Sequence, residues 1–444
     1  MNPTTRGILL YVGMALLIVA TGIIQSWTVA LTILNLGLIS AVMALGVNIQ
    51  WGYAGLFNAG VMGFAALGGA GVVLTSMPPV KGALSAGGAN LGLAALFILL
   101  TIVATVFVRR RVPRYLRGPV GLVTVLVGYL LMRIFLDPAS EAIEAIDPAA
   151  AGYLGGLGLP VLLGWAVGGL FAAGAAYLVG MVALGLRSDY LAIATLGIAE
   201  IILAVLKNEN WLTRGVKNVT GLPHPIPVER ELQAAPWIGD LAARFGSDVI
   251  STAGIVSRLG YALLFTVVLL AILWLAERAL HSPWGRMMRA IRDNRDAAEA
   301  MGKHVTRRHL QVFVLGSAVI GIGGAMLVTL DGQFTPGSYN PLRYTFLIWV
   351  MVIVGGSGNN WGAVLGGFLI WYVWVIAEPA GGWLMRTLTS GMAPGGFWQQ
   401  HLLAAAPHIR LLLMGLILLV VLRFAPQGLI PERSARQIRA PGAV

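Results

Sequence analysis

Long apolar stretches alternate with short polar connections along this chain, and the pattern predicts a bundle of membrane helices. About twelve stretches approach the roughly 20 apolar residues that a bilayer requires. They are Gly7 to Ile24, Thr28 to Ile49, Gly55 to Thr75, Leu91 to Val108, Gly118 to Leu136, Val161 to Leu184, Leu191 to Leu206, Leu259 to Leu275, Leu310 to Leu330, Tyr344 to Val354, Ala363 to Ala377 and Leu411 to Phe424. Because several are short, we predict an all-α polytopic integral membrane protein with about 10 to 12 transmembrane or re-entrant helices. Residues 1–444 are expected to form a single transmembrane domain.

Composition supports this fold class and excludes several kinds of chemistry. Hydrophobic residues make up 57% of the chain and charged residues 11%, whereas soluble domains are about 25% charged. The absence of cysteine excludes disulfides, thiol nucleophiles and cysteine-ligated metals. The 6 histidines fall in loops or at the ends of predicted spans, so we expect no haem pair, metal site or other cofactor.

The distribution of Lys and Arg predicts the orientation in the membrane. If the N-terminus is cytoplasmic and every segment crosses, most of the 30 Lys and Arg residues fall in inside loops. The net charge of +12 then reflects the positive-inside rule and not nucleic-acid binding. We therefore predict two cytoplasmic termini, an extracytoplasmic loop at residues 207–258, a cytoplasmic loop at residues 277–309 and a cytoplasmic tail at residues 425–444.

A charge-dense island at residues 277–309 interrupts the apolar pattern. Ser282 followed by Pro283 predicts a helix start with a hydroxyl cap, because proline at the first helical position loses no hydrogen bond. Gly302 suits a left-handed helix end. We expect a short cytoplasmic helix, or a pair of helices, between these points.

This island presents two surfaces that suit a soluble partner. Arg286, Arg289 and Arg292 recur at three-residue spacing and are predicted to form a basic face. The sequence from Asp296 to Gly302 adds a small-residue surface suited to a groove on another protein. The alternative is a solvated loop helix that only satisfies the positive-inside rule.

Polar groups inside the predicted spans are candidates for the substrate path. Glu200 carries a burial cost, so it is expected to line the path or hold a substrate ammonium group, or else to bond to a neighbouring helix. Uncharged polar side chains near the second span cost less to bury. They are expected mainly to join helices, with substrate contact as the less favoured role: Asn35, Asn48, Gln50 and Asn58. Three glycines there are candidates to expose backbone groups at broken-helix ends: Gly52, Gly55 and Gly60.

Several motifs resemble one family of transport proteins. The Asp296-Ala297-Ala298-x-x-x-Gly302 pattern resembles the EAA loop of ABC-transporter permeases, with Asp in place of the usual Glu. Stretches similar to the LivM-type permease of branched-chain amino acid importers occur in family order: VNIQWGYAGLFNAG (47–60), RSDYLAIATLGIAEII (187–202), SPWGRMMRAIRDNRDAAEAMG (282–302), GGSGNNWG (355–362) and the C-terminal RFAPQGLI (423–430).

The resemblance implies an ABC importer permease bundle in the cell inner membrane, with a division of labour. A second related permease would complete the path, and a periplasmic substrate-binding protein would deliver the cargo. Two cytoplasmic ABC ATPase subunits would dock on Pro283, Gly285, Arg286, Arg289, Arg292, Asp296, Ala297, Ala298 and Gly302. The segments within 91–136 look like an extra helical pair relative to the family core.

No G-x-x-x-x-G-K-[ST] phosphate loop occurs, so ATP hydrolysis is expected in partner subunits and this chain is not predicted to be an enzyme. The expected cargo is a branched-chain or other apolar amino acid, with urea or a short-chain amide as the alternative. An ion-coupled secondary transporter is a further alternative, but such carriers usually hold several intramembrane acids and this chain has one clear case, Glu200.

The outside loop contains a second recognisable element. Pro236 to Phe245 has the pattern of a short amphipathic helix that lies at the membrane interface, with Trp237 as an anchor. We predict that this face receives the binding protein. The alternative is a helix that only covers the membrane surface.

Overall fold

The computed structural model describes residues 3–113, 115–146, 155–392 and 396–432. Within them, 10 helices are long and apolar enough to cross a membrane, and two shorter apolar helices accompany these. The long helices are α1 (Pro3–Ile24), α2 (Trp27–Ala54), α4 (Ala83–Arg111), α5 (Arg117–Glu144), α6 (Val161–Ala183), α7 (Ser188–Asn208), α11 (Val249–His281), α14 (Val305–Asp331), α16 (Asn360–Thr389) and the segment that joins α17 (Phe397–Ala405) to α18 (Ile409–Phe424). Each predicted apolar segment is helical for most of its length, which confirms the all-α membrane fold.

The remaining elements are short. Two helices lie inside the bundle, namely α3 (Val61–Ser76) and α15 (Leu347–Gly355), the latter preceded by the π-helical turn Leu342–Phe346. The others lie in connections: α8 (Asn210–Thr213), β1 (Val219–Thr220), α9 (Glu229–Gln233), α10 (Pro236–Phe245), α12 (Pro283–Asp293), α13 (Arg295–Ala300) and β2 (Gln333–Phe334). Strands β1 and β2 pair antiparallel, a contact that the sequence did not predict.

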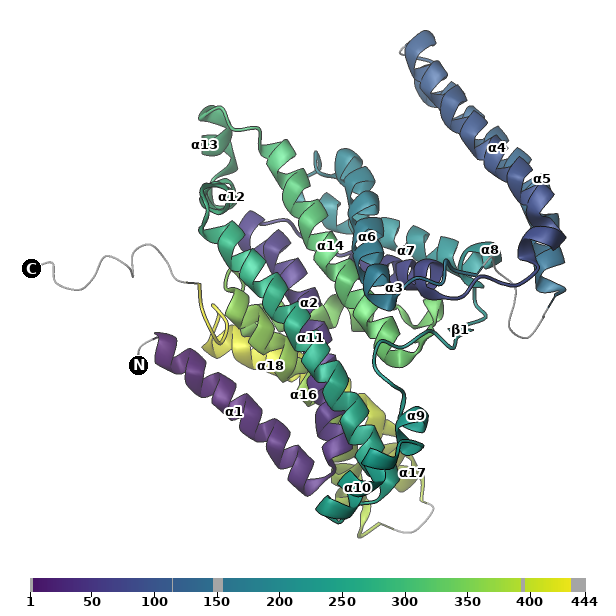
Figure 1. Cartoon of the computed structure of the whole chain (residues 1–444). Helices are drawn as coiled ribbons and strands as arrows, with labels where there is room; N and C mark the ends of the chain where they lie inside the picture. The colour runs from purple at the N-terminus through teal and green to yellow at the C-terminus, as the bar shows by residue number, and fades with distance from the viewer. Residues whose placement is uncertain (1–2, 114, 147–154, 393–395, 433–444) are drawn as a thin grey trace, which may run out of the picture.

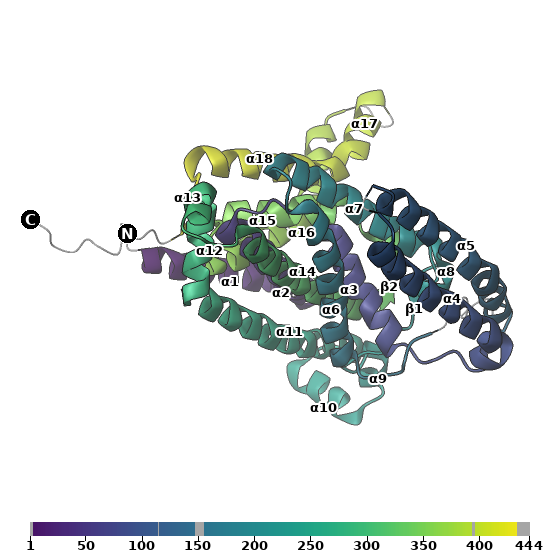
Figure 2. The ribbon, with the colours of Figure 1, turned by 90° about the horizontal axis from the view of Figure 1, so that it is seen from above.

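Helices α2 and α14 form the centre of the molecule (Figures 1 and 2). In their most apolar stretches, 78% and 72% of the residues are buried. Three glycines on α3, α6 and α14 face one another's backbones, and a β-carbon on any of them would overlap a neighbouring main chain: Gly68, Gly168 and Gly321. Small residues allow membrane helices to approach this closely.

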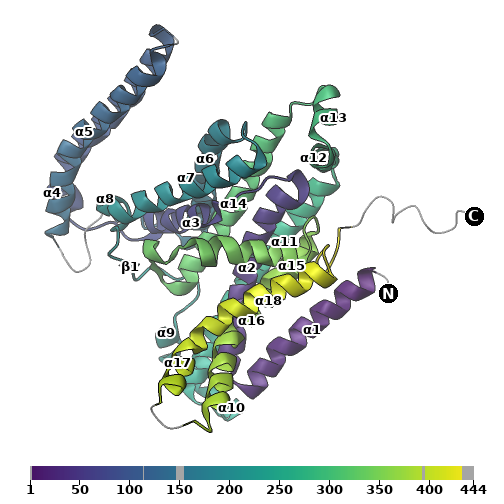
Figure 3. The ribbon, with the colours of Figure 1, turned by 180° about the vertical axis from the view of Figure 1, so that it is seen from behind.

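The hairpin of α4 and α5 stands apart from this centre (Figures 1 and 3). Its helices pack mainly on each other: the rings of Phe97 and Phe135 stack at 5.3 Å, and Gly128 lies against Thr101. Only 11% of the residues in the most apolar stretch of each helix are buried. The predicted extra pair at 91–136 falls within this hairpin, and its origin as an insertion stays a prediction.

The bundle has two ends, which we call the α12 face and the α10 face after the helices they carry (Figure 1). Helix α10 has the predicted bounds, and its Ile238 and Ala242 are buried. The first turns of α1 and the end of the described chain share the α12 face, because Gly7 and Glu432 line the same cavity as His281. Of the predicted tail, residues 425–432 are described and 433–444 lie outside the described residues.

Candidate functional site

The charge-dense island folds as two helices that differ in how they are held. Met288 and Ile291 of α12 are buried against the bundle, whereas α13 has no buried residue. The break between them is at Asn294, whose side-chain oxygen accepts a hydrogen bond from the Ala297 amide at 3.0 Å. The predicted pair of helices is therefore present, with one anchored and one exposed.

The start of α12 corrects one prediction. The Ser282 hydroxyl donates to the Ala279 carbonyl at 2.6 Å and makes no cap bond to α12, so the predicted hydroxyl cap was wrong. The physical reason is that the last carbonyls of α11 also lack helical partners, and the hydroxyl serves one of them. Pro283 occupies the first turn, and Gly302 has the predicted left-handed conformation with φ of 75°.

The arginines of α12 turn largely toward the chain itself. Arg286 donates to the His281 carbonyl and Arg289 to the Leu280 carbonyl, both at 3.2 Å. These carbonyls belong to the last turn of α11, where cationic donors are favourable. Arg286 is exposed and Arg289 is half-buried. Arg286 and Arg289 therefore fasten α12 to the end of α11. The three arginines do not form one outward basic face.

Arg292 is the junction of the site. It donates to the Gly52 carbonyl at the end of α2, pairs with Glu432 at 2.9 Å and contacts Asp293 at 3.0 Å. Burial of its guanidinium lowers the pKa, but the bonds to Glu432 and Asp293 outweigh this and hold the pKa above its ordinary value. Arg292 therefore joins the charge-dense island to α2 and to the C-terminal residues.

Two sequence motifs far apart in the chain meet beside this junction. The amides of Leu429 and Ile430 donate to the carbonyls of Val354 and Gly355 at 2.8 and 2.9 Å, and the Asn359 side chain donates to the Pro431 carbonyl at 3.1 Å. In the turn, Gly356 and Gly358 have φ of 122° and 81°, which L side chains rarely adopt. The GGSGNNWG turn and the RFAPQGLI end therefore form one packed unit, a contact that neither motif alone predicted.

A line of buried amides leads from that turn to α11. The Asn48 side chain donates to Asn360 Oδ1 at 3.0 Å and accepts from the Gly358 amide at 2.9 Å. Asn360 in turn donates to Glu277 Oε1 at 3.0 Å. Asn48 is 0% exposed. Its hydrogen bonds join α2, the turn and α16, as expected for a polar group that connects membrane helices.

A second buried group joins α2 to α14 and to the segment before α3. Gln50 donates to the Phe313 carbonyl and to Ser317 Oγ at 2.9 and 3.0 Å, and accepts from the Asn58 side chain at 2.9 Å. The Asn58 oxygen accepts from the Gly60 amide at 2.9 Å. These bonds confirm that the amides join helices. A substrate contact for Asn48 or Asn58 stays a prediction.

The connection at residues 55–60 is non-helical and largely buried. The span predicted from Gly55 begins only at Val61, because Gly55 ends α2 in the left-handed region with φ of 70°. Side chains form hydrogen bonds with the backbone of this connection: the Ala59 amide donates to Thr195, the Ala59 carbonyl accepts from Thr345, and Trp349 donates to the Asn58 carbonyl. Gly52 and Gly60 have no room for a side chain, since a β-carbon would overlap backbone at Gly358 and Thr195. Exposure of backbone to substrate here stays a prediction.

Glu200 lies on the outward face of α7. It is exposed together with Ile193 and Ile201, whose exposed fractions are 71% and 62%, and a β-carbon on Gly197 would meet nothing within 4 Å. Within the described residues no hydrogen bond or ion pair to Glu200 is found. The alternative of a carboxylate bonded to a neighbouring helix of this chain is therefore not what the structure shows.

Comparison with known proteins decides the family. The family described as the permease component of a branched-chain amino acid transport system matches residues 29–422. The chain belongs to this family. The permease is 26% identical to the high-affinity branched-chain amino acid permease LivM of Escherichia coli K12 over 332 residues, which cover 71% of this chain and 70% of the relative. No solved structure matches it.

Two other relatives show the breadth of the similarity. A probable branched-chain amino acid permease LivM of Methanocaldococcus jannaschii is 24% identical over 67% of this chain and 76% of the relative. The xylose permease XylH of E. coli K12 is 24% identical over 59% of this chain and 56% of the relative. The predicted LivM-type resemblance is confirmed, and the permease is a multi-pass membrane component of a transport system. Neither a urea or amide permease nor an ion-coupled carrier finds support in these comparisons.

Proposed function

We propose that this permease forms half of the path of an ATP-driven importer in the cell inner membrane and carries branched-chain or other apolar amino acids. The α12 face would be cytoplasmic, with both termini on that side. The observation that carries the proposal is the contrast within the charge-dense island (residues 277–309), which we now call the coupling segment: α13 has no buried residue, whereas α12 is fastened to the bundle. An exposed helix on an anchored base suits the docking of a soluble ATPase subunit.

The anchored base offers a physical route for the coupling. Besides the Arg292 junction, the Trp284 ring nitrogen donates to Gln311 at 3.3 Å, and Arg308 donates to the same oxygen at 3.1 Å. A displacement of α12 therefore acts on α2, α11 and α14 together. Two ABC ATPases that bind the two states of the bundle with different affinity would shift it between outward-open and inward-open forms.

The outward face of α7 suits the companion permease. An ionisable side chain that faces lipid is costly, and such groups usually face a bundle interior or a water-filled path. The exposed Glu200 beside the open position at Gly197 would be covered by a second, related permease and would lie at the shared path. There it can hold the ammonium group of an amino acid.

On the opposite side, α10 is the proposed landing site for a periplasmic binding protein. Its Ile238 is 0% exposed while Trp237 is 52% exposed. The helix is therefore anchored to the protein by its buried side and presents an aromatic side chain to the outside. Deletion of residues 236–245 should abolish uptake that depends on the binding protein, and intact uptake would refute this part of the proposal.

Uptake by membrane vesicles that hold the complete transport system tests the function. Vesicles loaded with ATP should accumulate labelled leucine, whereas labelled xylose and urea in parallel should stay outside. Ala297→Arg, at an exposed position of α13, should reduce ATP-dependent leucine uptake at least about tenfold, because a buried unpaired charge at a docking surface is strongly unfavourable.

Ala86→Arg is the matched control, since Ala86 is also exposed but lies in the first turn of α4, outside the charge-dense island. It should leave uptake near that of the parent protein. Accumulation that ignores ATP and follows an ion gradient would overturn the importer, and xylose uptake in place of leucine would change the cargo alone.

A further inference from the structure

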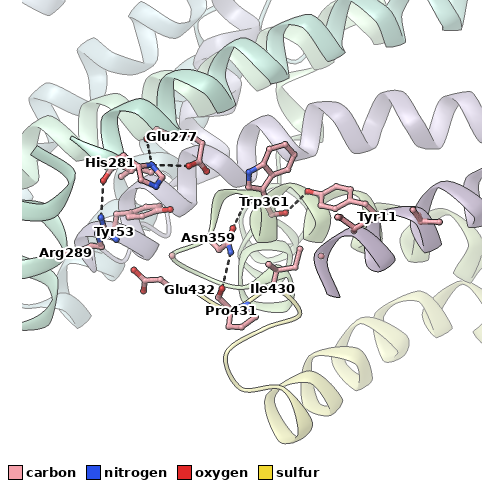
Figure 4. Close-up of a pocket in the computed structure, with 15 residues that line it drawn as sticks. Tyr11, Tyr53, Glu277, His281, Arg289, Asn359, Trp361, Ile430, Pro431 and Glu432 are labelled. Carbon is pink, nitrogen blue, oxygen red and sulfur yellow. Dashed lines mark hydrogen bonds and ion pairs between the residues drawn. The ribbon is translucent and has the colours of Figure 1, made fainter. Parts of the chain in front are cut away.

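A cavity of about 510 Å³ lies on the α12 face beside the Arg292 junction, and the transport proposal assigns no ligand to it. It is bounded by the first turns of α1, the ends of α2 and α11, helix α12, the turn before α16 and the last described residues (Figure 4). Its volume is in the range of small-molecule sites, which is about 300 to 1,000 Å³.

One half of the cavity carries charges of both signs (Figure 4). Glu277 and Glu432 contribute carboxylates, and their side chains are 31% and 26% exposed. Arg289 uses one of its donors for the Leu280 carbonyl, which leaves others of its five N–H groups for the cavity. His281 lies beside Glu277 at 3.3 Å. The Tyr53 hydroxyl points into the space between these groups.

The other half is apolar and belongs to α1 and to the first turn of α16. Trp361 and Tyr11 form its wall, held together by a hydrogen bond from the Tyr11 hydroxyl to the Trp361 carbonyl at 2.7 Å. Ile8 and Val12 line the cavity although they are 60% and 50% exposed. The apolar half therefore opens onto the outer surface of a membrane-spanning helix.

We infer that this cavity binds a zwitterionic amphiphile, a molecule with an ammonium group beside an anionic group and with an apolar tail. The ammonium group would lie between Glu277 and Glu432, the anionic group at Arg289, and the tail along Ile8 and Val12. A purely anionic ligand would meet two carboxylates, and a purely cationic one would meet Arg289. Each would leave the cavity charges of one sign without an opposite charge on the ligand.

Two sources share this chemistry: the aminophospholipid headgroup of the surrounding membrane and a free apolar amino acid. Either would contact α1, α12 and the C-terminal segment at once, and so hold together the elements that surround the Arg292 junction. The inference does not rest on the transport proposal, because it concerns binding to the isolated permease.

Equilibrium binding to the full-length protein in detergent tests the site. Dihexanoyl phosphatidylethanolamine should bind about tenfold more tightly than dihexanoyl phosphatidylglycerol, which has the same tails and phosphate but no ammonium group. Leucine is the competing probe. Displacement of the lipid by leucine identifies a free amino acid as a ligand, and the absence of displacement identifies the lipid headgroup.

Two adjacent positions on α1 provide the control. Ile8→Trp fills the cavity and should abolish the preference, whereas Leu9→Trp, at a similarly exposed position that does not line the cavity, should keep it. If Ile8→Trp does not fold, Glu432→Gln serves instead and should remove the difference between the two lipids. Equal binding of both lipids to the parent protein would overturn the inference. A preference that survives in Ile8→Trp and in Glu432→Gln would overturn it as well.

Discussion

The helices of the α2–α14 centre and of the α4–α5 hairpin are all strongly apolar, with mean hydropathies of 2.1 and 2.1 against 2.8 and 2.0, but the former are buried and the latter exposed. In the centre, glycines meet backbone and amides meet partners on other helices of the same chain. In the hairpin, apolar side chains face outward, and the described polar groups bond within their own helix or at its base. The difference shows that apolarity decides which segments enter the membrane, while small and polar residues decide which segments pack.

The same contrast appears within the coupling segment. Helix α12 is anchored by buried side chains and by arginines that serve the end of α11, and α13 carries none of these contacts. Surfaces that the chain leaves open are therefore the ones that we assign to partners: α13, the outward stripe of α7 and Trp237 of α10. The following tests compare the two regions, beginning with the largest expected effect.

A glycine-to-leucine pair should separate the centre from the hairpin most clearly. Gly68→Leu places a side chain on the Gly321 backbone and should cost more than about 3 kcal/mol, because main chain cannot move aside as a side chain does. Gly92→Leu in α4 meets nothing within 4 Å and should be neutral or slightly stabilising. The measurement is the fraction of monodisperse protein after heating in detergent, followed by size-exclusion chromatography.

Similar losses in both variants would show that the hairpin is packed against the rest of the protein and would end the comparison. Similar tolerance in both would mean that α3 and α14 can move apart at Gly68.

Removal of one buried amide should have the next largest effect. Gln50→Leu leaves the Asn58 side chain, the Ser317 hydroxyl and the Phe313 carbonyl without their partner, at an expected cost of about 2 kcal/mol. Thr124→Val is the matched change in α5, where the hydroxyl bonds only to the Val120 carbonyl of its own helix. It should change stability by less than about 0.5 kcal/mol.

Thermal unfolding in detergent measures both variants. A Gln50→Leu protein as stable as its parent would indicate that neighbouring groups find new partners, and the amides would then be free to serve another purpose, such as substrate contact.

The apolar segments, the extent of α10 and the conformation of Gly302 were predictable because each depends on a local property, such as hydrophobic length, amphipathic spacing or glycine at a helix end. What could not be predicted depends on contacts between distant residues. The spacing of Arg289 and Arg292 is the same whether they face a partner or the ends of α11 and α2, and only the tertiary structure distinguishes these cases.

Glu200 and the two C-terminal motifs illustrate the same limit. An acid in an apolar segment signals a cost but not the side on which it lies, and the structure places this one outward. The pairing of Leu429 and Ile430 with the 354–355 backbone brings together residues about 75 positions apart, and their sequences carry no local sign of it. Ser282 shows the competing case, in which the carbonyls of the preceding helix accept the hydroxyl that was expected to cap the next one.

The smallest expected effect concerns how the hairpin is attached. Arg133 of α5 pairs with Glu209 at 2.6 Å, and Lys217 pairs with Glu144 nearby. A partly exposed ion pair contributes about 1 kcal/mol or less, so Arg133→Gln should leave the permease folded but loosen the hairpin. Because the chain has no cysteine, spin labels at Leu99→Cys and Ile193→Cys can report the distance between hairpin and bundle. That distribution should broaden in the variant, whereas one between Ile193→Cys and Leu263→Cys, both on the bundle, should not. An unchanged hairpin distribution would mean that the Lys217 pair, the Tyr129–Glu209 hydrogen bond and the adjoining connections suffice to hold it, and the hairpin would then have to be treated as a fixed part of the bundle.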